Sequence, residues 1–389
     1  MTSFISKKML NKHLLVYSLF FLTLISFFIG FEFRENSAGG GIIDLKHEWH
    51  NYNLLKNDKL SFLYGNYEAS RFPLFHIINI YINPFINSQP DFILSFFLYS
   101  LILIVIFYFS LKTTFRDNHV IIFLFLSILL LSPYFRTSSF WGLQENLAYI
   151  FFLLSFLIFE KNRNYIFLIL FLSFLSFYSD QKFIFLPLIF LLSLFDKNKI
   201  FCSNNKKLLL YSTILSIPGI VIFYIWGGIT KSETTSGINE LSFRPQNIIY
   251  TINIMAVYFF PFLVFAKKKV FINFFKKIKI IYILSFIIVY IVIRYYFIDI
   301  ALPISGGWSF KIFRFFFNIN IALSEIIFFF ISLFSYLLVL FYLKEIIKSF
   351  INKILVLFLI FFPLSMEIVF QEYFDPLMFF IIIFFIHKN

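Results

Sequence analysis

Long apolar runs follow one another along almost the whole chain, and they limit what it can fold into. Hydrophobic residues make up 60% of the 389 residues, whereas charged residues make up only 14%. Soluble domains carry about 25% charged residues, and a soluble core cannot hide this much apolar surface. Because a helix needs roughly 20 apolar residues to cross a bilayer, the sequence predicts an all-α, polytopic transmembrane protein with about twelve spans.

The expected spans are separated by short polar loops and form a single transmembrane domain over residues 1–389. We interpret the first run, residues 14–31, as an uncleaved span and not as a signal peptide, because further apolar runs follow it. Residues 32–73 form a long first loop on the non-cytoplasmic side. Within this loop, residues 42–55 indicate a short amphipathic helix on the membrane, and residues 73–86 indicate a re-entrant or interfacial segment. The other spans are expected at 91–111, 120–135, 146–159, 164–179, 182–195, 208–227, 247–265, 280–298, 319–343, 354–370 and 376–387.

The charges sort between the two sides of this topology. The net charge is +13, and three lysine clusters, at 197–207, 267–279 and 344–353, fall in loops assigned to the inner side. Cytoplasmic loops carry an excess of Lys and Arg, so both termini are predicted to be cytoplasmic. The charge is thus explained by topology, and no nucleic-acid partner is expected. The short loops and the composition favour a bacterial inner (plasma) membrane.

Arginine departs from this sorting. It is rare in the chain, yet six of the eight arginines are expected on the outer side. A guanidinium group offers a planar fork of donors that suits phosphate and carboxylate groups. These arginines therefore either pair with acids on the outer side or hold an anionic substrate there. They are Arg34, Arg71, Arg136, Arg244, Arg294 and Arg314.

The first loop carries the candidate catalytic acids, Asp44 and Glu48. Four residues apart, they share one face of a helix, and a carboxylate there is able to deprotonate a hydroxyl group. His47 and His50 lie beside them, but their spacing is not that of a zinc-binding helix. We therefore assign no cofactor and no metal site, while a divalent ion stays open as an alternative.

Further polar patches interrupt the apolar runs at outer helix ends. Ser179-Asp180-Gln181-Lys182-Phe183 is an abrupt patch of this kind, and Lys311 and Arg314 are spaced to face one phosphate group together. Glu325 and Glu367 lie deeper, where a charge is costly, and are expected to face a cavity or carry a proton. The candidate substrate-binding residues are His47, His50, Arg71, Arg136, Glu145, Asp180, Gln181, Lys182, Trp308, Lys311, Arg314, Glu372 and Asp375.

Together these features resemble the GT-C superfamily of membrane glycosyltransferases, and within it the dolichyl-phosphate-glucose-dependent α-1,2-glucosyltransferases and their bacterial relatives. Three places carry the resemblance. The segment from Asp44 to His50, followed by Ser70-Arg71-Phe72-Pro73-Leu74, is similar to that family's acidic motif and its proline-containing re-entry. Residues 179–183 are similar to its Arg-Gln motif, with Asp180 in place of the Arg. Residues 370–376 are similar to its closing Glu-Phe-Arg-Tyr-type motif, without that Arg.

The resemblance implies sugar transfer from a polyprenyl-phosphate donor to a glycan or lipid-linked acceptor at the outer, periplasmic face. An ionised carboxylate, Asp44 first and Glu48 second, would deprotonate the acceptor hydroxyl. Arg71, Lys182, Lys311 and Arg314 would stabilise the departing lipid phosphate. Glu145, Gln181 and Glu372 would contact the sugar or the acceptor. Membrane lipids are the other expected partners.

Two other readings remain. A transporter or flippase of lipid-linked oligosaccharide would explain Glu325 and Glu367, although transporters usually place polar groups near the midplane and often contain repeats. An O-antigen polymerase or ligase also has many spans, but its largest outer loop is expected late in the chain, whereas here the longest loop is the first.

Overall fold

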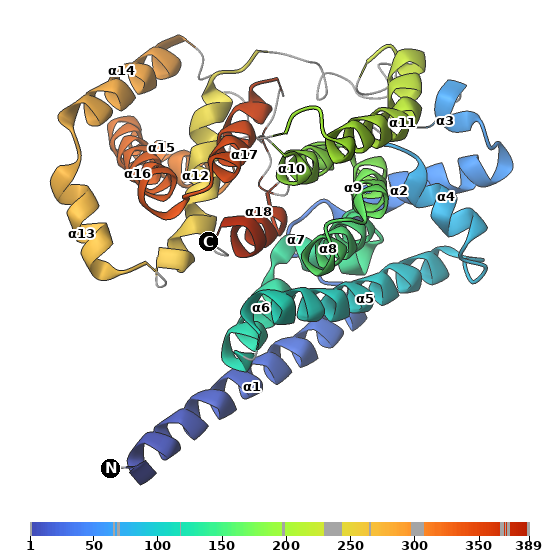
Figure 1. The fold of residues 1–389 in the computed structure, drawn as a ribbon, viewed down its shortest axis with the longest axis horizontal. Coiled ribbons are helices and arrows are strands. Elements are labelled where there is room, and N and C mark those ends of the chain that lie inside the picture. Colours follow the sequence, from blue (N-terminus) through green and yellow to red (C-terminus); the bar gives the residue numbers. More distant parts are fainter. Residues whose placement is uncertain are drawn as a thin grey trace. The chain divides into compact units, whose positions relative to one another are not determined.

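The computed structural model describes residues 2–64, 67, 71–116, 118–196, 199–228, 243–263, 266–296, 307–365, 369, 371 and 374–386. Every regular element among them is a helix, and none of these residues lies in a β-strand (Figure 1). The predicted all-α class is therefore confirmed. The chain divides into two compact units, Met1–Thr235 and Ser236–Asn389.

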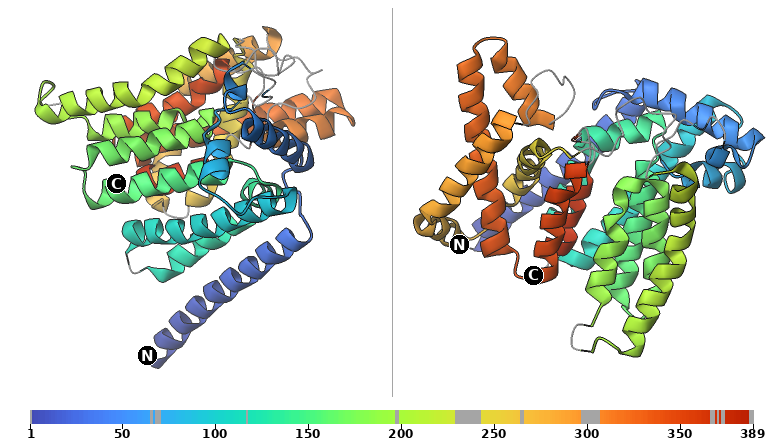
Figure 2. Two further views of the ribbon diagram at one scale, coloured as in Figure 1. Left: turned by 90° about the vertical axis from the view of Figure 1, so that its right-hand side faces the viewer. Right: turned by 90° about the horizontal axis from the view of Figure 1, so that it is seen from above.

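The first unit is a group of helices in which neighbours in sequence mostly pack side by side. In Figure 2, α8, α9, α10 and α11 run alongside one another, α5 packs on α8, and α1 lies along α6. The elements are α1 (Thr2–Glu32), α2 (Gly41–Asn57), α3 (Ser61–Tyr64), α4 (Leu74–Tyr81), α5 (Gln89–Phe115), α6 (His119–Leu131), α7 (Pro133–Trp141), α8 (Glu145–Lys161), α9 (Ile166–Ser179), η1 (Gln181–Phe183), α10 (Phe185–Leu194) and α11 (Ser203–Trp226).

The turn before α2 depends on glycine. Gly39 and Gly40 have φ angles of 79° and 78°, a left-handed conformation that glycine adopts without the steric cost of a Cβ atom. Gly40 is the residue that precedes α2, and its carbonyl oxygen accepts hydrogen bonds from the N–H groups of Ile43 and Asp44. The helix that follows covers the residues in which the sequence indicates an amphipathic helix.

The break between α6 and α7 has a clear local cause. Ser132 ends α6 and caps α7, and its hydroxyl accepts a hydrogen bond from the N–H of Phe135 at 3.2 Å. Pro133 occupies the first position of α7, where its missing N–H group costs nothing. The two helices are bent by 61° at this point. The run expected as one span at 120–135 is therefore two helices, and α7 brings a polar segment back into the packed interior.

Aromatic side chains supply much of the packing in the first unit. Phe27 of α1 is completely buried and stacks on Phe97 of α5 and Phe135 of α7, at ring-centroid distances of 5.6 and 5.4 Å. Phe72 lies between Phe177 and Trp226 and joins the start of α4 to α9 and α11. These contacts hold the short segment before α4 against the long helices.

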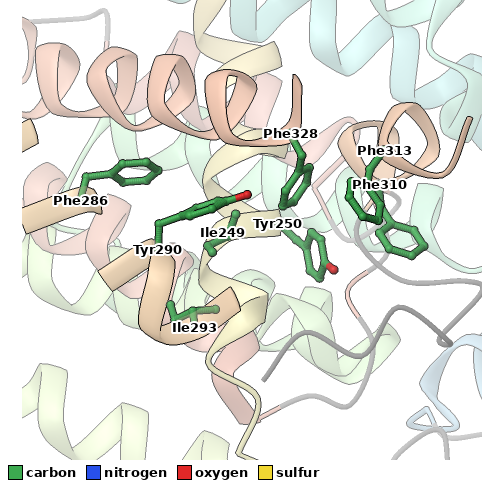
Figure 3. Packing of buried hydrophobic residues seen from close by; sticks show 8 residues of the cluster. All are labelled: Ile249, Tyr250, Phe286, Tyr290, Ile293, Phe310, Phe313 and Phe328. Atoms are coloured by element: carbon green, nitrogen blue, oxygen red, sulfur yellow. The ribbon is translucent and has the colours of Figure 1, made fainter. Parts of the chain in front are cut away.

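The second unit is built around α12 and α16. Its main aromatic cluster is shown in Figure 3, where Phe286, Tyr290, Phe310, Phe313 and Phe328 surround Ile249 and Tyr250 of α12. The elements are α12 (Gln246–Phe262), α13 (Lys268–Lys277), α14 (Ile280–Tyr296), α15 (Gly307–Phe317), α16 (Ile321–Phe341), η3 (Tyr342–Ile346), α17 (Phe350–Phe361), η4 (Phe362–Ser365), α18 (Leu377–Ile381) and η6 (Ile382–Ile386).

The apolar helices are those of an integral membrane protein. By length and composition, four of the described helices are able to cross a bilayer, and up to six spans result if each of two bent pairs is one span. In the apolar stretch of α11, only 11% is buried against the rest of the protein. Most of the apolar surface of this helix therefore requires an apolar solvent such as lipid. The expected number of about twelve spans is not confirmed, because several apolar runs form helices of 10–17 residues.

Candidate active site

Six polar side chains from five parts of the first unit meet in one place. They are supplied by α2, by the segment that leads into α4, by α4 itself, by the start of α8 and by the turn from α9 to η1. We call this group the charged cluster. Its members are Glu48, Arg71, His76, Glu145, Asp180 and Lys182.

Glu145 is the centre of the charged cluster. Its Oε1 atom lies 3.2 Å from Nη1 of Arg71 and 3.2 Å from Nζ of Lys182. Its other carboxylate oxygen accepts a hydrogen bond of 3.2 Å from the hydroxyl of Ser138, which is carried by α7. Lys182 also lies 3.2 Å from Oδ2 of Asp180. One carboxylate therefore connects three elements that are distant in sequence.

Glu48 forms the second half of the charged cluster. Its Oε1 atom is 3.8 Å from Nη1 of Arg71, so Arg71 lies between the two glutamates. Its Oε2 atom is 3.0 Å from Nε2 of His76, without the geometry of a hydrogen bond. The attraction between these two groups therefore depends on a proton on the imidazole ring.

The charged cluster is almost entirely buried. Glu48, Glu145 and Asp180 are 6%, 8% and 3% exposed, whereas the side chain of Arg71 keeps 24% of its surface exposed. Three carboxylates therefore face two cations, Arg71 and Lys182, inside the packed interior. Burying ions costs several kcal/mol each unless they are paired, and hydrophobic helices do not require such a group in order to pack.

Several buried polar atoms around Glu48 have no hydrogen-bond partner among the described residues. They include Oε2 of Glu48, both ring nitrogens of His76 and the hydroxyl of Tyr67, whose ring contacts His76 edge to face at 5.8 Å. The side-chain amide of Gln144, next to Glu145 in sequence, is also buried without a hydrogen-bond partner among these residues. Buried polar atoms are nearly always satisfied in folded proteins. An excess of such atoms at one place is typical of a site that binds a polar substrate or water.

The turn that carries Asp180 and Lys182 is defined by its own side chains. α9 ends at Ser179, and Asp180 has extended backbone. The carboxylate of Asp180 accepts a hydrogen bond of 3.1 Å from the N–H of Lys182 and thereby caps η1. The same carboxylate then faces the ammonium group of Lys182. An aspartate at this position fixes both the backbone and the position of the cation.

The charges of the cluster govern the ionisation of two groups that lie outside the apolar parts of the helices. Burial opposes the ionisation of Glu145, but the positive charges of Lys182 and Arg71 hold the pKa of this carboxyl below its ordinary value. Burial raises the pKa of Tyr67 well above its ordinary value, and the nearby Glu48 carboxylate acts in the same direction. Glu145 is therefore an anion and Tyr67 a neutral phenol at neutral pH.

The residues expected from the first loop separate onto two faces of α2. Glu48 is buried in the charged cluster, and Asp44, one turn earlier on the same face, is half-buried. His47 and His50 are exposed. Gln181 is half-buried beside Lys182. The structure thus brings Glu48 together with Arg71, Glu145, Asp180 and Lys182, with Asp44 one helical turn away.

Arg136 has a different environment. Its guanidinium group forms a bidentate ion pair with Glu35, in which Nε lies 3.1 and 3.0 Å from the two carboxylate oxygens, and it also donates to the carbonyl oxygen of Leu130 at 3.2 Å. A Cβ atom on Gly30 would lie only 2.4 Å from Nη2 of Arg136. The small residue therefore permits this close approach. Arg136 ties the end of α1 to α7, which is the pairing with acids that the sequence left open.

This ion pair should make stability depend on pH. The hydrogen bond from Arg136 lowers the pKa of Glu35 below its ordinary value. Because the pKa is lower in the folded state, the contribution of the pair is complete above the ordinary carboxyl range and is lost as the pH falls through the lowered value. We expect Glu35→Gln to melt at a lower temperature than the wild type at pH 7, and this difference to shrink in acid. Melting curves of both proteins from pH 7 to pH 3 would measure it; a difference that grows in acid would contradict the assignment.

The remaining candidates belong to the second unit. The indole N–H of Trp308 donates to the carbonyl oxygen of Asn253 at 3.1 Å. Lys311 and Arg314 are exposed on α15, three residues apart. Asp375 is buried, at 8% exposure. Glu372 lies outside the described residues, as does Glu367.

His76 and Tyr67 are members of the site region to which the sequence assigns no role. His76 is completely buried in α4, whose other residues are mostly apolar. A single imidazole in an apolar helix needs a polar partner. A histidine in this position therefore indicates in the sequence that a polar group lies nearby. Tyr67 gives no such signal, because the chain contains 22 tyrosines and most of them are simply aromatic packing residues or membrane anchors.

Within the part of the chain that the structure describes, no group of three or more His, Cys, Asp or Glu side chains is arranged to hold a metal ion. Comparison of the chain with models of protein families, with curated proteins and with solved structures finds no match.

Proposed function

We propose that this protein is a membrane glycosyltransferase of the GT-C type, which transfers a sugar from a polyprenyl-phosphate donor to a glycan or lipid-linked acceptor. The observation that carries the proposal is the charged cluster beside Asp44. It combines buried carboxylates, two cations and buried polar atoms without hydrogen bonds, and the half-buried Asp44 lies one helical turn before Glu48. A lipid-linked sugar phosphate has both of the chemical features that such a site would recognise, namely sugar hydroxyl groups and a phosphate.

The proposed reaction is a single displacement. The acceptor hydroxyl loses its proton to the carboxylate of Asp44 as its oxygen attacks the anomeric carbon of the sugar. The bond between that carbon and the phosphate oxygen breaks, and the lipid phosphate leaves with the bonding electrons. Asp44 is favoured over Glu48 because it is more accessible, whereas Glu48 is held between Arg71 and His76.

The cations have distinct parts in this proposal. Arg71 keeps part of its side chain exposed, so its positive charge is accessible to a lipid phosphate, and a positive charge stabilises the charge that develops on the leaving group. Lys182 and Glu145 hold Arg71 in position through their shared ion pairs. Lys311 and Arg314 are exposed cations on one helix of the second unit, and their role at a phosphate stays a prediction from the sequence.

The sidedness of the reaction rests on the distribution of charge. Lysine clusters lie at 197–207, 267–279 and 344–353. An excess of lysine indicates that the helix ends next to these clusters lie in the cytoplasm. The charged cluster is at the opposite end of α9 from the start of α11, which holds Lys206 and Lys207. We infer an active site on the periplasmic side of a bacterial inner membrane, with both termini in the cytoplasm.

The direct test is sugar transfer by the purified protein in liposomes. A panel of radiolabelled polyprenyl-phosphate sugars would be supplied with lipid-linked acceptors, and the wild type would be compared with Arg71→Met. The proposal expects transfer from at least one donor and a strong loss in the variant. If a folded wild-type protein transfers no sugar from any donor, the proposal fails, and movement of lipid-linked oligosaccharide becomes the next activity to measure.

Transport is the second candidate, and it depends on Glu325 in α16. This carboxylate forms a bidentate ion pair with Arg294 of α14, in which Nε lies 2.8 Å from Oε2. Arg294 also stacks over the ring of Phe313 at 5.5 Å. A carboxylate paired in this way is already neutralised in the apolar region, so its presence is explained without a transported ion or proton.

The two explanations differ in a measurable way. Glu325→Gln leaves Arg294 without its carboxylate in an apolar surrounding, and we expect it to lower the free energy of unfolding by about 2–3 kcal/mol. The double variant Arg294→Met with Glu325→Met should recover most of this loss, because apolar residues often replace a buried pair well. Thermal melting of the wild type and of these two variants would show it. A double variant that is stable but stops the movement of lipid-linked oligosaccharide would favour transport.

A further inference from the structure

A cavity lies at the other end of α9 from the charged cluster. It has a volume of about 420 Å³ and is formed where the turn before α9 meets the first turns of α11. α9 has 14 residues, so at 1.5 Å per residue the cavity is about 20 Å from Asp180. It is therefore separate from the site described above. Its lining includes Asn164, Phe167, Leu168, Asn204, Lys207 and Tyr211.

The lining of this cavity is polar on one side and apolar on the other. Asn164, Asn204 and Lys207 supply amide and ammonium groups near the helix starts. Phe167 and Leu168 extend from the first turn of α9 and keep 49% and 41% of their surface exposed. The neighbouring surface of α11 is also apolar and exposed. A soluble anion would use only the polar side, whereas an amphipathic ligand would cover both.

The charge around the cavity is positive. Exposed cations dominate this end of the helices, and the acids present among the described residues are Glu160 and Asp196. Basic pockets between transmembrane helices bind the headgroups of anionic lipids. The nearby exposed cations are Lys161, Arg163, Lys199, Lys206 and Lys207.

We propose that this cavity binds an anionic phospholipid. The ammonium group of Lys207 and the amides of Asn164 and Asn204 contact the headgroup phosphate, while Phe167, Leu168 and Tyr211 contact the glycerol and the upper acyl chains. In the topology inferred from the charges, the lipid belongs to the cytoplasmic leaflet. The proposal concerns lipid binding alone and does not depend on the sugar-transfer reaction.

The test uses the full chain in detergent and native mass spectrometry with added phosphatidylglycerol or phosphatidylcholine. Lys207→Gln is compared with Lys206→Gln, because both lysines are exposed and adjacent, but only Lys207 lines the cavity. We expect the wild type to prefer phosphatidylglycerol, and Lys207→Gln to weaken that binding about fivefold, the value for one lysine near an anionic headgroup. Lys206→Gln should bind as the wild type does.

A second variant tests the apolar side. Leu168→Trp places a larger side chain in the cavity at a partly exposed position, so it should fold and should weaken phosphatidylglycerol binding. Inorganic phosphate should not displace the lipid, because it lacks the apolar contacts. The proposal is overturned if the two lysine variants lose binding equally, if phosphatidylcholine binds as well as phosphatidylglycerol, if Leu168→Trp has no effect, or if inorganic phosphate alone displaces the lipid.

Discussion

The Asp44→Asn variant is expected to transfer sugar at least about 100-fold more slowly than the wild type, because general-base catalysis contributes roughly 10²–10⁴-fold to such reactions. Asparagine keeps the shape of the side chain but does not accept the proton of the acceptor hydroxyl. The fold should be retained, since Asp44 is half-buried in the first turn of α2, asparagine has the same size, and the lost interaction with the helix dipole costs about 0.3–1 kcal/mol. The turnover rate and the melting temperature of the same preparation would separate the two effects.

Glu48→Gln and Asp58→Asn complete this experiment. Asp58 is an exposed acid at the other end of α2, so Asp58→Asn should leave transfer unchanged and serves as the matched control. Glu48→Gln should lower the rate by weakening the hold on Arg71 and His76, and should also lower stability. Full activity of Asp44→Asn combined with an inactive, folded Glu48→Gln would move the base to Glu48. Full activity of both variants would remove the catalytic proposal for this loop.

Glu145→Gln should destabilise the protein more than any other single change in the charged cluster. The substitution removes the carboxylate that lies 3.2 Å from both Arg71 and Lys182. Breaking a buried pair by removing one partner costs about 3–5 kcal/mol. Lys182 keeps Asp180 and Arg71 keeps Glu48, so we expect a loss of about 3 kcal/mol, at the lower end of that range.

Denaturant unfolding of the wild type and the variant at pH 7 would measure this loss. Glu32→Gln is the matched control, because Glu32 is exposed at the end of α1, and exposed substitutions usually change stability by less than about 0.5 kcal/mol. A loss no larger than that of the control would mean that the ion pairs of Glu145 contribute nothing to the fold.

The stability difference caused by Glu145→Gln should also depend on pH in a defined direction. The folded-state pKa of Glu145 is below its ordinary value, because Lys182 and Arg71 outweigh the effect of burial. Its contribution is therefore complete above the ordinary carboxyl range and is lost as the pH falls through the lowered value. The difference between wild type and variant should stay constant from pH 7 to about pH 5 and close only in stronger acid. A difference that vanished already near pH 6 would indicate a raised pKa and contradict the ion-pair geometry.

The residues of the charged cluster were recognisable in the sequence as separate polar patches, but not as a group. Glu48 and Arg71 belong to the polar first loop, and Glu145, Asp180 and Lys182 lie at the ends of apolar runs, where an ionised side chain is costly. Nothing in their spacing predicts that Arg71 and Glu145, which are 74 positions apart in the numbering, are in contact. The same holds for Arg136 and Glu35, 101 positions apart. The sequence placed Arg136 among the candidate substrate-binding residues. Its ion pair with Glu35, which the sequence does not reveal, explains why the arginine is there.

The number of spans is a property of the predicted fold that the described residues do not confirm. Apolar length alone does not separate a crossing helix from a short helix buried by neighbours. The run at 120–135 ends at Ser132-Pro133, where the chain bends by 61° into α7. The proline was visible in the sequence, but whether it ended one span or bent it depended on the packing of Phe135 and Phe140 against Phe27 of α1.

The sequence by itself determined that this protein lies in an apolar medium and that its secondary structure is helical. Sixty per cent hydrophobic residues in long runs require helices in an apolar medium, because every backbone polar group there must be satisfied within the helix. Gly39 and Gly40 likewise determine a local turn. Tertiary structure alone decided which charged residues are buried together, and it selected Glu48, His76 and Glu145 while leaving His47 and His50 exposed. The physical reason is that burial and ion pairing are properties of contacts between distant segments, whereas helix formation depends on neighbours along the chain.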